Sequence, residues 1–94
     1  MDIKQKLIYL IDQSSLSAED KSAWSIAVES YPEQAVESFL DIFSNFPEEI
    51  VWFNDLYKRK TEAFQILKEN EVKGWSLLQE IFSEEKNKLE QFLT

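Results

Sequence analysis

The sequence predicts an all-α fold, a small helical bundle in which three short N-terminal helices pack on two longer C-terminal helices. Three observations lead to this prediction. Apolar residues recur at helical spacing along most of the chain. One glycine and two prolines are the only strong helix breakers among the 94 residues. Each proline follows an aromatic residue and precedes a glutamate, as is common at a helix start.

The first two helices are expected over residues 2–13 and 17–30. In the first, apolar residues keep the i, i+4, i+7, i+8 spacing of one helix face. They are Ile3, Leu7, Leu10 and Ile11. In the second, the Ser17 hydroxyl can accept a backbone N–H of the first turn. Glu19 and Asp20 follow at the positive end of the helix dipole.

The third helix is expected over residues 32–45, and the fourth begins near residue 47. Pro32 and Pro47 suit the first turn of a helix, where a missing backbone N–H is harmless. Acidic residues follow both prolines and favour the positive end of the helix dipole.

The rest of the chain admits two interpretations. One is a single continuous helix of about 45 residues that passes through a stutter in its heptad pattern. The other is two helices, over residues 47–70 and 73–93, that meet at a turn between Asn70 and Gly74. Asparagine and glycine favour the turn, so five helices are preferred over four.

The predicted core consists of large apolar side chains on the inner faces of the five helices. On the fourth helix, Lys60 fills one slot of an otherwise apolar, heptad-like series. The predicted core members are Leu7, Ile11, Trp24, Val28, Phe39, Leu40, Phe43, Phe53, Tyr57, Phe64, Leu67, Leu78 and Phe82.

The composition argues against catalysis. The chain has no histidine and no cysteine, so it lacks the imidazole, the thiolate and the nitrogen and sulfur ligands on which most catalytic and zinc sites depend. Adjacent carboxylates such as Glu48 and Glu49 do not face each other on a helix. We therefore expect no enzymatic activity, no cofactor and no metal site.

A single domain covering residues 1–94 is expected, in the cytoplasm. The absence of cysteine suits a reducing compartment, and no apolar stretch approaches the roughly 20 residues of a membrane span. The net charge of −8 disfavours direct contact with nucleic acid or with an anionic membrane. The expected partner is another protein or a second copy of the chain.

The leading functional hypothesis is a small acidic protein-interaction module, a homodimerising adaptor or an inhibitor. Aromatic residues make up 14% of the chain, which is generous for one small core. Wide apolar faces on the last two helices indicate contacts on two sides, either as central helices of the five-helix fold or with a partner. The residues expected to form the partner contact are Trp52, Trp75, Leu77 and Ile81.

Glu33, Glu37 and Asp41 form an acidic stripe at i, i+4 and i+8 on the third helix. Like charges at this spacing are mildly destabilising. The stripe is therefore either a solvated helix face of an acidic protein or a surface that steers a basic partner. The alternative hypothesis is an acidic mimic of nucleic acid that blocks a DNA- or RNA-binding protein. A weaker option is phosphate contact by the basic cluster of residues 58–60, although consecutive helical residues do not form one patch.

Overall fold

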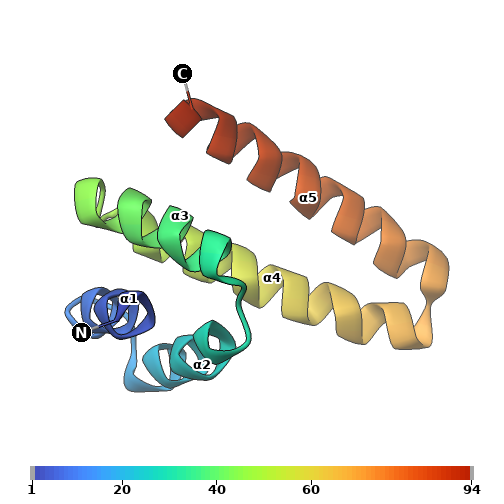
Figure 1. Cartoon of the computed structure of the whole chain (residues 1–94). Coiled ribbons are helices and arrows are strands. Elements are labelled where there is room, and N and C mark those ends of the chain that lie inside the picture. Colours follow the sequence, from blue (N-terminus) through green and yellow to red (C-terminus); the bar gives the residue numbers. More distant parts are fainter. Residues whose placement is uncertain (1, 94) are drawn as a thin grey trace. The chain divides into compact units, whose positions relative to one another are not determined.

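The computed structural model describes residues 2–93, with the backbone alone for Leu93, and it confirms the all-α fold class. Its helices are α1 (Ile3–Asp12), α2 (Ala18–Glu29), α3 (Glu33–Asn45), α4 (Glu49–Glu69) and α5 (Glu71–Leu93), and no strand occurs in this part of the chain (Figure 1). Every predicted helix boundary lies within two residues of the observed one. The last two helices are separate, so the single long helix is excluded.

The chain divides into two compact units, and the division falls inside α4. Unit 1 ends at Trp52 and contains α1, α2, α3 and the first turn of α4. Unit 2 begins at Phe53 and contains the rest of α4 together with α5.

Side-chain caps define the first two helix starts of unit 1. Asp2 and Gln5 form a reciprocal capping box, in which the Asp2 carboxylate accepts from the Gln5 amide at 2.8 Å. The Ser17 hydroxyl accepts from the Asp20 amide at 3.1 Å, which confirms the predicted cap of α2. Pro32 lies one position before the first turn of α3, in extended backbone, rather than within that turn.

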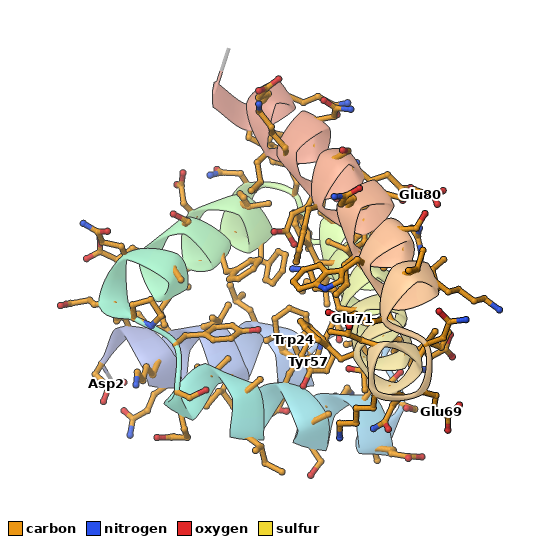
Figure 2. All side chains as sticks on the ribbon, turned by 90° about the vertical axis from the view of Figure 1, so that its right-hand side faces the viewer. Asp2, Trp24, Tyr57, Glu69, Glu71 and Glu80 are labelled. Carbon is orange, nitrogen blue, oxygen red and sulfur yellow. The ribbon has the colours of Figure 1, made fainter. Side chains whose placement is uncertain are left out.

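The core of unit 1 is built around aromatic rings of α2 and α3. Trp24 points inward from α2 (Figure 2), and its ring meets the Phe43 ring edge-on at 6.0 Å and the Phe39 ring edge-on at 5.8 Å. Helix α1 packs against both α2 and α3. The fully or nearly fully buried side chains of this core are Leu7, Ile11, Trp24, Val28, Val36, Ile42, Phe43 and Ile50. Phe39 and Leu40, which were predicted to be inside, are only half-buried.

Unit 2 is a helical hairpin whose two helices are separated by a single residue, Asn70. The Asn70 amide donates to the Ile66 carbonyl at 2.7 Å and so closes α4. The side-chain oxygen of Asn70 accepts from the Lys73 backbone amide at 3.1 Å. The backbone carbonyl of Asn70 accepts from the Gly74 amide at 2.9 Å. Asn70 therefore ends one helix and caps the next. Glu69 and Glu71 flank this junction in Figure 2.

Gly74 has a different role from the one predicted. It lies inside α5 rather than in the turn, and its φ is not positive. A β-carbon at this position would lie 2.7 Å from both the backbone nitrogen and the β-carbon of Leu67. At Gly74, α5 thus comes so close to the backbone of α4 that only a residue without a side chain fits there.

The core of unit 2 includes Phe53 and Leu78 as predicted, but its other members lie on a helix face shifted by one residue from the predicted one. Ala63 is 2% exposed, whereas Phe64 and Phe82, both predicted to be inside, are 48% and 42% exposed. Tyr57 and Leu67 are half-buried. The prediction followed the large aromatic side chains of α4, but a small residue on the inner face lets two helices approach more closely. The buried apolar side chains of this unit are Phe53, Leu56, Ala63, Leu78 and Ile81.

Candidate functional site

Two charged pairs fix how α4 and α5 face each other in unit 2. Lys60 on α4 forms an ion pair with Glu85 on α5, and both side chains are about one quarter exposed. Arg59 pairs with Glu84 at 2.6 Å, in a more exposed position. The Lys60 ammonium also lies 5.6 Å from the centre of the Phe82 ring, within the range of a cation–π contact. Lys60 is therefore part of the seam between the helices, as its place in the heptad-like series indicated.

The Arg59–Glu84 pair also shifts the pKa of both groups. The hydrogen bond to Arg59 holds the pKa of the Glu84 carboxyl below its ordinary value, because it favours the charged form. The hydrogen bond to Glu84 raises the pKa of Arg59 in turn, with smaller contributions from the negative charges of Glu84 and Glu80. Glu80 projects from the outer side of α5 (Figure 2).

The two ion pairs show which residues of α4 and α5 lie on the same side of the hairpin. Successive helical residues turn by about 100°, so Arg59 and Phe64 are rotated from Lys60 in opposite directions. On α5, Glu84 and Phe82 likewise lie on opposite sides of Glu85. Since Arg59 and Glu84 meet on one side, Phe64 and Phe82 share the other side.

Trp75 belongs to the same side, because it precedes Phe82 by seven residues, or about two helical turns. Phe64, Trp75 and Phe82, which are 42–49% exposed, thus form one surface that we call the aromatic flank. Val72 extends it toward the junction and is also exposed. The aromatic flank thus combines half-exposed rings from both helices, with Phe64 on α4 and Trp75 and Phe82 on α5.

On α5, the aromatic flank is part of a stripe of residues whose spacing is typical of a second helix–helix contact. Its positions on α5 are separated by three, four, three and four residues, which is the spacing of a coiled-coil face. They are Val72, Trp75, Gln79, Phe82 and Lys86. This stripe runs beside the inner face of α5, which contains Gly74, Leu78, Ile81 and Glu85. Helix α5 therefore has one face used within the hairpin and an adjacent face that is partly exposed.

The four predicted apolar contact residues are divided between the two units, with Trp52 in unit 1 and the other three in unit 2. Ile81 is 2% exposed and belongs to the core of unit 2. Leu77 is half-buried and, being two residues from Trp75, is turned away from it by about 200°. Trp52 is half-buried and lies in unit 1. Of the four, only Trp75 lies on the aromatic flank.

Sequence reasoning missed Phe64, Phe82 and Val72 as surface residues. It assigned the two phenylalanines to the core because large apolar residues at heptad-like spacing are usually inside. The 3-4-3-4 spacing of the stripe that begins at Val72 was a usable signal. Two heptad-like stripes on one helix indicate two helical contacts rather than one.

The acidic stripe is present as predicted, and its three side chains are exposed on α3. Glu33, Glu37 and Asp41 lie on one face of this helix. Asp41 also accepts from the Asn45 side chain, through its carbonyl at 2.8 Å and its carboxylate at 3.3 Å. Charge is unequal between the units, because ten carboxylates oppose three lysines up to Trp52, whereas eight oppose seven basic residues from Phe53 onward. The net charges are −7 and −1.

The basic cluster of residues 58–60 is not one surface. Arg59 and Lys60 are each bound to a different carboxylate of α5. Their charges are used to hold the hairpin together, so they offer little to a phosphate group.

Within residues 2–93, no group of three or more acidic side chains is placed to hold a metal ion. Two shallow depressions of about 320 Å³ and about 310 Å³ occur on unit 1. The first lies between Lys4, Tyr31 and Glu33, and the second between Leu10, Pro47 and Val51.

The fold and the aromatic flank define an acidic all-α protein with two helical units. No helix within residues 2–93 combines the length and the apolar character needed to cross a bilayer. No protein-family model matches the sequence, and neither a curated protein nor a solved structure is significantly similar to it.

Proposed function

We propose that this chain is a small, acidic, non-catalytic protein-interaction module that acts as a homodimerising adaptor or as an inhibitor. The observation that carries the proposal is the aromatic flank, on which Phe64, Trp75 and Phe82 expose 42–49% of their surface side by side. Rings of this size are the residues that most often supply binding energy at the centre of protein interfaces. Their arrangement on two packed helices gives them little conformational freedom to lose on binding.

Several properties of the chain support the rest of the proposal. The lack of histidine and cysteine leaves no imidazole to shuttle a proton and no thiolate nucleophile. The excess of carboxylates in unit 1 would steer a basic partner surface toward it. A cytoplasmic location is part of the proposal, and a chain without cysteine suits that reducing compartment.

Site-directed photo-crosslinking in cells tests the proposal. A photoreactive amino acid at Gln79, which lies between Trp75 and Phe82 on the stripe, should yield a defined protein adduct. The same probe at Ser22, an exposed position on α2, is the matched control. The adduct should disappear in the Trp75→Ser/Phe82→Ser variant. If Gln79 gives no more adduct than Ser22, the interaction role of this surface is wrong.

A second candidate function is a nucleic-acid mimic that blocks a DNA- or RNA-binding protein. The acidic stripe supports it, because its carboxylates recur about every 6 Å along α3 within a unit of net charge −7. A partner held by charge should dissociate steeply as salt is added. Reversal of the stripe by Glu33→Lys, Glu37→Lys and Asp41→Lys should abolish that binding, whereas unchanged binding would rule out the mimic.

A further inference from the structure

We infer that the aromatic flank is covered by the same flank of a second copy of this chain, with the two α5 helices antiparallel. The inference rests on the proposed interaction function and names its partner. It is drawn from the spacing of the flank, from the charges at its two ends and from the distribution of charge between the units.

The spacing suits a helical partner. The 3-4-3-4 stripe from Val72 to Lys86 is the pattern with which one helix packs along another. Trp75 and Phe82 are seven residues apart, about 10 Å along the helix axis. Gln79 lies between them, so a two-fold axis near Gln79 places each Trp75 beside the Phe82 of the second copy.

The charges at the ends favour the antiparallel direction. Glu71 and Lys86 lie near opposite ends of the stripe, both are exposed, and neither has an ion pair within residues 2–93. An antiparallel alignment centred near Gln79 places Glu71 of each copy beside Lys86 of the other, so the dimer has two such pairs of opposite charges. A parallel alignment would set like charges together at both ends, which is unfavourable.

The charge distribution favours contact through unit 2. Unit 1, with a net charge of −7, would repel its own copy, whereas unit 2 is nearly neutral at −1. The aromatic flank is therefore the surface on which a second copy meets the least long-range repulsion.

The size of the flank makes the dimer weak. A large aromatic side chain offers about 150–250 Å² in all, and three half-covered rings leave roughly 300 Å² per copy. A stable interface covers about 800 Å² per partner, so the dimer should dissociate on dilution.

Sedimentation equilibrium over about 5–500 μM, the range in which weak interfaces dissociate, tests the inference on the full chain. The wild-type mass should rise from 11.1 kDa toward twice that value. Trp75→Ser/Phe82→Ser should lower the association constant at least tenfold. The control is Ile26→Ser, which removes an apolar side chain that is 74% exposed on unit 1, and it should leave the association unchanged. Circular dichroism and thermal melting confirm that each variant is folded.

A charge swap tests the direction of the helices. Glu71→Lys alone and Lys86→Glu alone should each weaken the dimer several-fold, and the double variant should recover the wild-type association. A chain that stays monomeric at all concentrations overturns the inference, as does a Trp75→Ser/Phe82→Ser variant that still dimerises. Failure of the double variant to recover overturns the antiparallel alignment. The crosslink from Gln79 to a different protein would sustain the proposed function even if the chain is monomeric.

Discussion

Gly74 packs directly against the backbone of Leu67, and this approach sets the distance between α4 and α5. A β-carbon at residue 74 would come within 2.7 Å of the Leu67 nitrogen. The obstructing atoms are backbone atoms and the β-carbon bonded to them, none of which can swing aside. The single glycine of the chain is therefore required by helix packing, three residues inside α5.

Gly74→Ala should destabilise the protein by about 1–3 kcal/mol, because the added methyl group forces the two helices apart. This result runs against helix propensity, by which alanine is favoured over glycine by about 1 kcal/mol. Urea denaturation followed by circular dichroism measures the change. Ser76→Ala, at an exposed position of the same helix, is the control and should alter stability by less than about 0.5 kcal/mol. A stabilised Gly74→Ala protein would contradict the close packing at Leu67.

Lys60 and Glu85 should be energetically coupled across the hairpin. Both side chains are less than one third exposed, so removal of either one leaves a partly buried charge without its partner. Lys60→Ala and Glu85→Ala should each cost about 1–2 kcal/mol, and the double variant should cost about 1 kcal/mol less than their sum. Chemical denaturation of the three variants gives the coupling.

Lys68 and Glu90 form the control pair for this coupling. Both are exposed charged residues of the same two helices, and neither has an ion pair in the described part of the chain. The effects of Lys68→Ala and Glu90→Ala should therefore simply add. Additive effects of Lys60→Ala and Glu85→Ala would show that their ion pair is absent in solution.

The Arg59–Glu84 pair should make the hairpin sensitive to acid. The pKa of Glu84 is lower in the folded chain than its ordinary value of 4.5, so its contribution to stability is present above that value. This contribution is lost as the pH falls through the lowered pKa, because the carboxyl then takes up a proton and the hydrogen bond to Arg59 weakens. The melting temperature of the wild type should fall on acidification more than that of Glu84→Gln. Identical pH profiles for the two proteins would mean that the pair does not contribute.

Phe43→Ala should be the most damaging of these substitutions. The Phe43 side chain is fully buried in unit 1 and lies edge-on to the Trp24 ring. Loss of a buried phenyl ring costs about 3–5 kcal/mol, a large share of the stability of a chain this small. Ile26→Ala, at an exposed position of α2, should cost less than about 0.5 kcal/mol. Thermal and urea unfolding measure both, and a small cost for Phe43→Ala would place the core of unit 1 elsewhere.

The sequence by itself predicted the helix boundaries to within two residues, but it left open whether residues 47–93 form one helix or two. The Ser17 cap and the turn at Asn70 could be predicted from the sequence because such features are local. Each side chain accepts a hydrogen bond from a backbone amide three residues further along the chain. The absence of histidine and cysteine follows from the composition alone. The acidic stripe on α3 could also be predicted, because it depends only on residues four apart in one helix.

Only the tertiary structure decided which face of each long helix is inside. Ala63 is buried and Phe64 is exposed, although hydrophobicity alone favours the opposite assignment, because the choice depends on a helix that follows later in the chain. Gly74 can be seen as a packing residue only when Leu67 lies opposite it. Side chains more than four residues apart meet through the path of the chain, and that path is set by how all the surfaces fit together.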